Sequence, residues 1–253
     1  MDLQKAVEHY KRNGELFPHT LLFGPPGVGK TYTALKIAEL QGLPYQRFIA
    51  QTFDVTILDR VIGHYTVIID EIHSLGKKKE ELLYPHLEKR QGTIIGCTTL
   101  LSRVSQPLRS RFVVVERMDL VPPDRIYEIL KCKADGKVSE EFLYTISRVA
   151  KGSVRTALNL LVRAGEFSTP EEMLKELDIT EDGLTRLDRQ YLAIVGKHKS
   201  VSLSTLCRIL GETEETVLTE VEPYLLRQEY VAISSRGREL TEKGRAALQV
   251  LYH

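Results

Sequence analysis

A glycine-rich segment near the N-terminus constrains the fold of this chain more than any other feature. Residues 24–31 read Gly-Pro-Pro-Gly-Val-Gly-Lys-Thr and fill every position of the phosphate-loop pattern G-x-x-x-x-G-K-[ST]. The apolar residues 21–23 before the loop predict a short buried strand, and Ala34, Ile37 and Ala38 after it recur at helical spacing. Strand, loop and helix in this order predict a nucleoside triphosphate site.

The residue types in the loop suit a polyphosphate. Glycines let backbone N–H groups turn toward the phosphates, which the positive end of the following helix also attracts. Lys30 is expected to reach the β- and γ-phosphates, and the Thr31 hydroxyl is expected to coordinate Mg²⁺. The predicted cofactor-binding residues are Gly24, Pro25, Pro26, Gly27, Val28, Gly29, Lys30 and Thr31.

Composition limits the partners of the chain. Lysine and arginine number 35 against 34 aspartates and glutamates, so any nucleic-acid contact must come from a local patch of charge. Short apolar runs and an N-terminus without a secretory segment predict no membrane segment. The three cysteines, Cys97, Cys132 and Cys207, are odd in number and widely spaced, which argues against a disulfide framework or a zinc site and predicts a cytoplasmic location.

A pair of acidic residues is the second functional feature, and it follows the phosphate loop in the sequence. Residues 67–69 are Val-Ile-Ile, which predicts a strand buried on both faces of a parallel sheet. Asp70 and Glu71 then fall at the carboxyl end of this strand, where α/β sheets bind ligands. We expect Asp70 to hold the Mg²⁺ shell and Glu71 to polarise the attacking water.

Hydroxyl and guanidinium groups later in the chain are further catalytic candidates. Thr98 and Thr99 end another predicted buried strand; one of them bonds the γ-phosphate or the attacking water, or both simply cap the next turn. Arg109 and Arg111 precede a predicted buried strand at 113–116; they are either surface charges or arginine fingers that reach a neighbouring subunit's γ-phosphate. Arg155, at the start of a predicted helix, is placed to close over bound phosphate.

Beyond residue 120 the pattern becomes helical. Val121 and two prolines mark the end of the predicted sheet domain, and a polar linker at 178–183 separates two helical regions. The first region is predicted to contain helices at 124–133, 139–150 and 154–167 and one from Pro170 capped by Thr169. A short amphipathic helix is also predicted ahead of the phosphate loop, at residues 2–12.

The last region has the pattern of a winged helix. Helices at 187–196, 203–210 and 213–228 are predicted to precede a hairpin of strands 230–234 and 239–241. The third helix carries Glu214, Glu215, Glu220 and Glu222, an acidic face that DNA phosphates would repel. Any DNA contact is therefore assigned to Arg236 and Arg238 in the predicted turn, as a backbone contact without base reading.

Together these residues resemble the RuvB family, the AAA+ motors of Holliday-junction branch migration. The likeness rests on the phosphate loop and on the segments 70–73, 81–85, 96–99, 107–112, 152–155, 187–189, 222–228 and 236–238. It implies that Thr98 or Thr99 is sensor 1, that Arg111 is the arginine finger with Arg109 as second candidate, and that Arg155 is sensor 2.

The resemblance also implies an architecture. We expect an α/β P-loop AAA+ domain, a parallel sheet with flanking helices, at residues 1–120. A helical lid at 121–178 and a winged-helix domain at 179–253 are expected to follow. The implied cofactors are ATP and Mg²⁺, and the implied assembly is a homo-oligomeric ring, expected to be a hexamer, acting on DNA.

Two departures from the family keep alternatives open. RuvB-like motors carry a hairpin before the sensor 1 strand that engages a junction-binding partner, and residues 89–92 leave no room for it. The family's N-terminal segment, which contributes to the adenine pocket, is mostly absent ahead of Leu3. A compact DNA motor is the leading hypothesis, a loader or adaptor for an unidentified partner protein is the second, and a nucleotide switch with little turnover is the third.

Overall fold

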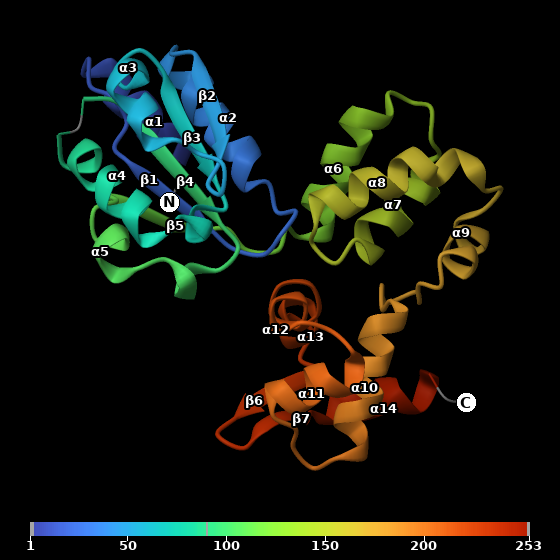
Figure 1. Cartoon of the computed structure of the whole chain (residues 1–253). Helices are drawn as coiled ribbons and strands as arrows, with labels where there is room; N and C mark the ends of the chain where they lie inside the picture. The colour runs from blue at the N-terminus through green and yellow to red at the C-terminus, as the bar shows by residue number, and fades with distance from the viewer. Residues whose placement is uncertain (1–2, 90, 252–253) are drawn as a thin grey trace. The chain divides into compact units, whose positions relative to one another are not determined.

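The computed structural model describes residues 3–89 and 91–251 and divides into two compact units. The first contains the chain up to Gly24 together with Gly29–Asp119, and the second contains Pro25–Val28 with the chain from Leu120 onward. Figure 1 shows a sheet with flanking helices in the first unit and helices with a small hairpin in the second. Asp2 and Arg90, which belong to a predicted helix and a predicted connection, lie outside the described residues. The domain bounds near 120 and 178 stay predictions.

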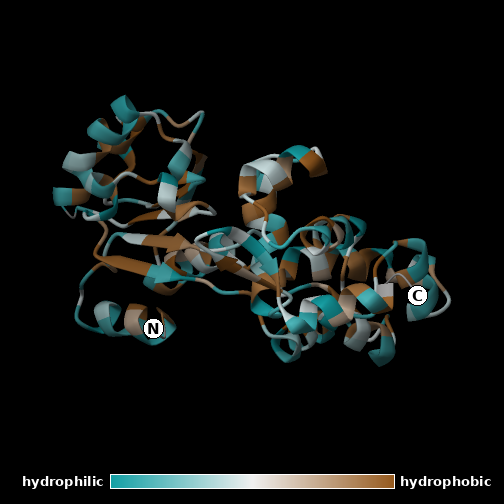
Figure 2. Cartoon of the chain, turned by 90° about the horizontal axis from the view of Figure 1, so that it is seen from below, coloured by the Kyte–Doolittle hydropathy of each residue, from teal (hydrophilic) through white to brown (hydrophobic). Residues whose placement is uncertain are grey.

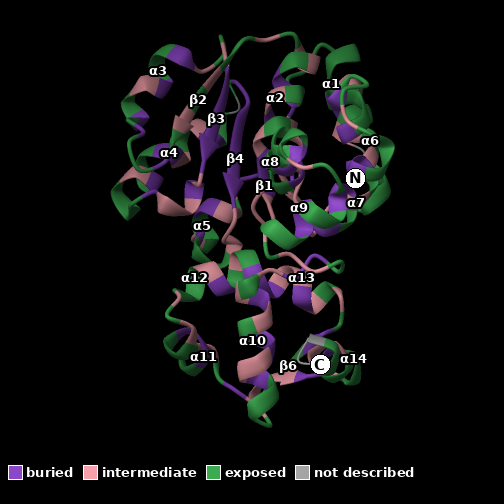
Figure 3. Ribbon diagram, turned by 90° about the vertical axis from the view of Figure 1, so that its right-hand side faces the viewer, coloured by how far each residue is buried: buried purple, intermediate pink, exposed green. Residues whose placement is uncertain are grey.

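A five-stranded parallel sheet forms the centre of the first unit. Its strands are β1 (Thr20–Phe23), β2 (Tyr45–Ile49), β3 (Thr66–Asp70), β4 (Ile94–Thr98) and β5 (Val114–Arg117), in the order β2-β3-β4-β1-β5. Central strands β3 and β4 are buried along their whole length, as their β-branched runs predict (Figure 3). Because every pairing is parallel, the carboxyl ends of all the strands lie at one edge.

Helices cover both faces of this sheet. They are α1 (Leu3–Arg12), α2 (Lys30–Gln41), α3 (Leu58–Val61), α4 (Lys77–Lys89) and α5 (Gln106–Arg109), with short 3₁₀ turns at Val55–Ile57, Ile72–Ser74 and Leu101–Arg103. One buried cluster joins α1 and α2 to the sheet, and a second joins α3, α4 and α5 to it. The helices cover the two faces of the sheet, and the carboxyl ends of its strands stay open at one edge. Sheets of this kind bind ligands at that edge.

Two details of this unit differ from the sequence prediction. The helical pattern that starts at residues 77–79 predicts that Leu82, Leu83 and Leu87 face inward. Leu83 and Leu87 of α4 are buried, but Leu82 is 56% exposed, because it points away from the core face of the helix. Strand β5 lies at the edge of the sheet and alternates between half-buried and exposed residues, so it is not a buried strand. Both errors come from apolar residues that the sequence alone could not assign to a face.

The lid region of the second unit is an all-helical bundle. Its helices are α6 (Pro123–Ala134), α7 (Glu140–Val149), α8 (Val154–Arg163) and α9 (Pro170–Glu176), with a 3₁₀ turn at Ala164–Glu166 after α8. Ser139, Ser153 and Thr169 each cap the following helix with a side-chain oxygen, which fixes where α7, α8 and α9 begin. The four predicted helices of this region are present.

The C-terminal region is a winged helix with its own core. It comprises α10 (Arg186–Lys197), α11 (Leu203–Leu210), α12 (Glu214–Thr216), a π-helical turn (Val217–Val221), α13 (Glu222–Arg227), β6 (Val231–Ser234), β7 (Gly237–Leu240) and α14 (Glu242–Leu251). The core of this region and that of the lid are separate clusters of buried residues.

Three predictions for this region need correction. The third helix is interrupted by the π-helical turn just before Pro223, which has no N–H for the regular helical ladder. The hairpin loop contains only Ser235 and Arg236, so Arg238 lies in strand β7 and not in the turn. Helix α14 follows the hairpin and is not among the predicted elements.

Hydrophobic residues are interleaved with hydrophilic ones along the helices, as Figure 2 shows. Each helix therefore buries one face only. None of the helices within residues 3–89 and 91–251 is long and apolar enough to cross a membrane.

Candidate active site and wing

The phosphate loop leads directly into helix α2. Gly29 has a φ of 98° and forms the left-handed N-cap, and Lys30 is the first helical residue. A Cβ atom on Gly24 would lie 2.0 Å from the Met118 carbonyl oxygen, so only glycine fits where the loop leaves β1. Lys30 is 8% exposed and its Nζ donates to the Gly24 carbonyl at 2.8 Å. The loop thus holds its ammonium group close to its own backbone.

Two oxygen ligands suited to Mg²⁺ lie together at the start of α2. The Thr31 hydroxyl donates to Asp70 Oδ1 at 2.9 Å, and Asp70 ends strand β3. Hydroxyl and carboxylate oxygens with a bound phosphate are the ligands that Mg²⁺ uses in nucleotide sites, so these two residues fit the ion. Arg47 of β2 donates to Asp70 Oδ2 at 2.5 Å and compensates its charge.

Glu71 has the backbone conformation and the contacts of a functional residue. Its φ is 51°, a left-handed conformation that non-glycine residues seldom adopt. Its Oε2 accepts from the Thr99 hydroxyl at 3.2 Å and lies 3.3 Å from Nδ1 of His73. The same His73 nitrogen lies 2.9 Å from Oγ1 of the fully buried Thr98. The two predicted sensor threonines therefore differ: Thr99 contacts Glu71 directly, and Thr98 contacts the histidine behind it.

The two candidate finger arginines also differ. Arg109 turns inward, donating to the carbonyls of Leu101 and Val104 at 2.8 and 3.0 Å. Arg111 pairs with Glu88 at 2.9 Å and lies over the ring of Tyr84, with 29% of its side chain exposed. Arg109 stabilises the local turns. Arg111 lies on the surface of α4, where its partly exposed contacts to Glu88 and Tyr84 can be replaced by contacts to another molecule.

Arg155 is exposed near the start of α8 in the second unit. Its backbone N–H donates to the carbonyl of Gly27 at 3.2 Å. A Cβ atom on Gly27 would lie 2.1 Å from the Ser153 hydroxyl, so this loop glycine and the helix N-terminus meet closely. The structure therefore joins the predicted sensor 2 segment to the tip of the phosphate loop.

The wing separates the two arginines that the sequence treats alike. Arg236 is in the hairpin loop with 82% of its side chain exposed, 3.9 Å from Glu239. Arg238 donates to both oxygens of Glu222, at 2.8 and 3.2 Å, and only 13% of its side chain is exposed. Tyr191 donates its hydroxyl to the same Glu222 carboxylate at 2.9 Å. Arg238 is thus committed to a buried ion pair.

The pKa shifts agree with these environments. The hydrogen bond to Glu222 raises the pKa of the Arg238 guanidinium, and burial raises the pKa of the Tyr191 hydroxyl, with Glu222 adding to that shift. Burial also raises the pKa of the Cys97 thiol beside Asp70, so this cysteine is protonated at neutral pH.

Sequence reasoning missed two residues of this site. His73 lies two positions after Glu71, but only the folded turn at Ile72–Ser74 brings its ring against Thr98. Arg47 is one basic residue in an unremarkable strand, and its proximity to Asp70 follows from the parallel pairing of β2 with β3. The pairing of β2 with β3 is a property of the folded sheet and not of the residues around Arg47.

Comparisons with known proteins decide the family. A model described as the Holliday junction DNA helicase RuvB P-loop domain matches residues 1–92, and one described as the RuvB C-terminal winged helix domain matches residues 181–249. The Holliday junction branch migration complex subunit RuvB of Lactobacillus helveticus is 31% identical over 279 residues, covering 94% of this chain and 80% of the relative. The chain belongs to the RuvB family. The RuvB subunit of Parasynechococcus marenigrum is also 31% identical, with 96% and 82% covered.

A solved RuvB structure supports the same conclusion for the fold. The Thermotoga maritima RuvB Holliday junction branch migration motor superposes with a TM-score of 0.87 at 30% identity, covering 98% of this chain and 92% of that one. The predicted RuvB resemblance and the predicted fold class are confirmed. The alignments of 279 to 293 residues exceed the 253 residues of this chain, so the relatives carry segments that it lacks.

Proposed function

We propose that this chain is an ATP-driven DNA motor of the branch-migration type, which acts as a ring, expected to be a hexamer. The observation that carries the proposal is the arrangement at the carboxyl ends of β3 and β4 in a RuvB-family chain. There Thr31 bonds Asp70, and Thr99 bonds Glu71. These are the parts that ATP hydrolysis requires: a metal-binding pair beside the phosphate loop, and a carboxylate beside a sensing hydroxyl.

Each of these residues has a distinct task in the proposed reaction. Lys30 leaves the Gly24 carbonyl to bind the β- and γ-phosphates, and Thr31 and Asp70 hold Mg²⁺, which would offset the phosphate charge. Glu71 orients the attacking water and accepts its proton. Thr99, which contacts Glu71 directly, is our choice for sensor 1.

The remaining charges act at the surfaces of the subunit. Arg111 is the proposed finger toward a neighbouring subunit, because its contacts to Glu88 and Tyr84 are partly exposed, whereas Arg109 bonds two internal carbonyls. Arg155 is proposed as sensor 2. Arg236 at the tip of the wing is the proposed contact to the DNA backbone. The unpaired cysteines among the described residues agree with a cytoplasmic setting.

A loader or adaptor is the second candidate, and one observation favours it. Helix α4 ends at Lys89 and strand β4 begins at Ile94, so the connection between them is too short to contain a β-hairpin. RuvB-like motors engage their junction-binding partner through a hairpin at this position. A chain without this element would couple ATP hydrolysis to a different protein.

A mobile four-way junction tests the proposal. Purified chain with ATP and Mg²⁺ should convert a labelled junction into duplex products, and Glu71→Gln, which keeps the binding residues, should bind ATP without forming product. Wild-type chain that hydrolyses ATP faster with DNA yet forms no product alone would favour the loader. In that case, the protein that copurifies with the chain from its host should restore product formation.

A further inference from the structure

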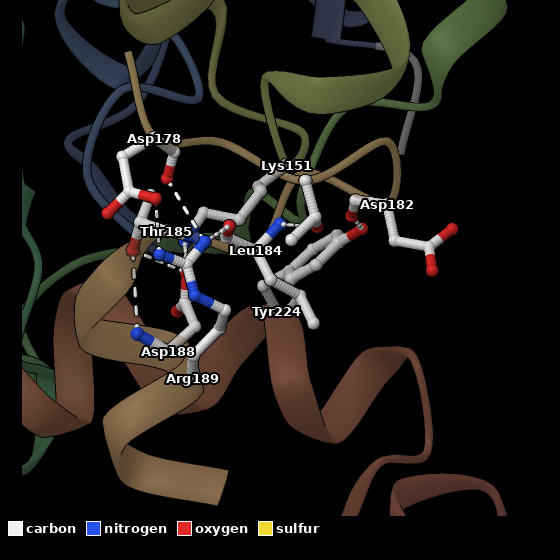
Figure 4. Close-up of polar contacts among 9 residues, drawn as sticks. Lys151, Asp178, Asp182, Leu184, Thr185, Asp188, Arg189 and Tyr224 are labelled. Atoms are coloured by element: carbon white, nitrogen blue, oxygen red, sulfur yellow. Dashed lines mark hydrogen bonds and ion pairs between the residues drawn. The ribbon is translucent and has the colours of Figure 1, made fainter. Parts of the chain in front are cut away.

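A buried ion pair connects the lid to the winged helix next to the sensor 2 segment. Lys151 Nζ lies 2.6 Å from Asp188 Oδ2, with 17% of the lysine side chain and none of the aspartate side chain exposed (Figure 4). Lys151 follows the C-cap of α7, and Asp188 is in the first turn of α10. The pair therefore joins the turn ahead of α8 to the first helix of the winged-helix region.

The backbone of the lysine turn is shaped for this contact. Lys151 has a φ of 55° and Gly152 a φ of 81°, so two consecutive residues adopt left-handed conformations. A Cβ atom on Gly152 would lie 2.5 Å from the Cβ atom of Leu120, so only glycine fits here. The Gly152 carbonyl accepts a hydrogen bond from the Val121 N–H at 2.9 Å. A non-glycine residue held in this conformation costs energy that the surrounding contacts must supply. The turn thus directs Lys151 toward Asp188.

The same turn meets the phosphate loop. Ser153 and Arg155 lie two and four positions after Lys151, and both approach Gly27 closely. The contact to the winged helix and the contacts to the phosphate loop thus lie within the five residues 151–155. A displacement of Gly27 on phosphate binding would move both ends of this short segment.

Asp188 depends on Lys151 for its charge balance. Its Oδ2 also accepts from the backbone N–H and the hydroxyl of Thr185, at 2.7 and 2.6 Å. Its Oδ1 has no hydrogen-bond partner, and Lys151 is its only ion-pair partner within residues 3–89 and 91–251. A buried carboxylate without a cation is strongly disfavoured, so Asp188 holds Lys151 firmly.

Polar contacts join these two regions, which have separate buried cores among the residues that the structure describes. The buried hydrophobic clusters of the lid and the winged helix are separate. A cavity of about 330 Å³ lies beside the pair, lined by Ser153 and Arg155 from the lid and by Thr185 and Tyr224 from the winged-helix side. The Tyr224 ring lies 5.6 Å from the lysine Nζ, and Arg227 donates to the Leu120 carbonyl as a second link.

We propose that Lys151 and Asp188 are positioning residues that couple the nucleotide state of the phosphate loop to DNA binding by the winged helix. The proposal rests on the proposed function and adds a specific route to it. The alternative is that the pair only stabilises the chain. A purely stabilising pair would change the unfolding of the chain without changing how nucleotide affects DNA affinity.

The test compares DNA affinity in two nucleotide states. The ratio of the duplex dissociation constants with ADP and with a non-hydrolysable ATP analogue measures the coupling, which typically spans about 5- to 150-fold in allosteric proteins. Lys151→Met should bring this ratio to within about twofold of one, and Lys151→Arg, which keeps the charge, should retain it. Lys131→Met is the matched control, because Lys131 pairs with Glu140 inside the lid at 3.0 Å, with both side chains exposed.

A double variant separates coupling from stability. Lys151→Met with Asp188→Asn leaves no buried unpaired charge, and the asparagine oxygen can still accept from Thr185. Its unfolding midpoint should return toward that of wild type while its ratio stays near one. A wild-type ratio in this double variant would overturn the coupling. A wild-type chain without any nucleotide effect on DNA binding would instead overturn the proposed motor function, and the coupling with it.

Discussion

Replacement of Arg238 by methionine should destabilise the winged helix without acting through DNA. The change keeps the length and packing of the side chain but removes both hydrogen bonds to Glu222. Glu222 is 2% exposed, and of its described partners only the Tyr191 hydroxyl would remain. The carboxylate would stay buried with its charge uncompensated.

The size of the effect follows from this burial. Removing one partner of a buried ion pair costs about 3–5 kcal/mol, because the other charge is left in a medium of low dielectric. About 1.4 kcal/mol changes an equilibrium constant tenfold, so this cost raises the population of the locally opened state by roughly 150- to 4,000-fold. Amide hydrogens that exchange through this opening should exchange faster by the same factor.

Hydrogen exchange of the full chain can measure this locally. Amides of α10, β6 and β7 should lose protection in Arg238→Met, while amides of α7 in the lid should not change. Arg236→Met is the matched control, since Arg236 is in the same hairpin and its side chain is 82% exposed. Equal protection in the two variants would refute the assignment of Arg238 to a structural ion pair. Neutralising both partners, with Arg238→Met and Glu222→Gln, should recover most of the lost protection.

Three further predictions concern nucleotide and DNA. Lys30→Ala should abolish tight nucleotide binding while Glu71→Gln retains ATP without turning it over, which filter binding and a hydrolysis assay measure; equal loss of affinity in both would show that the roles are misassigned. Arg111→Ala should bind ATP normally and hydrolyse it about 10³–10⁵-fold more slowly, and mixing it with Glu71→Gln subunits should restore some hydrolysis, whereas no recovery after demonstrated co-assembly would argue against a shared site. Arg236→Ala should weaken binding to all duplex sequences alike and lower the slope of log K against log salt by about 0.9; an unchanged slope would remove Arg236 from the DNA surface.

Much of the fold was predictable because its signals are local. The phosphate loop sets the order of β1 and α2, and the run at 67–69 identifies the buried strand β3. Serine and threonine caps mark the starts of α7 and α9. The burial of Leu82 depends on which face of α4 packs against the sheet, and the burial of β5 depends on its position in the strand order. Neither can be read from a short window of sequence.

The candidate site was predictable in its residue types but not in its pairings. Thr98 and Thr99 are adjacent and chemically identical, yet one is fully buried against His73 and the other contacts Glu71. Strand alternation places neighbouring side chains on opposite sides, so which hydroxyl faces the carboxylate depends on how β3 and β4 pair. The contact between Lys151 and Asp188 joins positions that are 37 residues apart, which no spacing rule predicts.

The wing shows why a count of charges can mislead. Sequence reasoning assigned Arg238 to DNA and counted Glu222 among the acidic residues that repel it, but the two residues neutralise each other inside the domain. Glu214, Glu215 and Glu220 stay exposed, so the third helix still presents negative charge. One exposed arginine then remains at the hairpin tip of each subunit, and a single phosphate contact contributes little affinity by itself. Sequence-independent binding by such a wing requires several subunits on one duplex, because linked weak contacts multiply into a strong one. If the chain binds DNA as proposed, the buried pairing of Arg238 therefore makes the proposed ring assembly more important for that binding than it would be with a two-arginine wing.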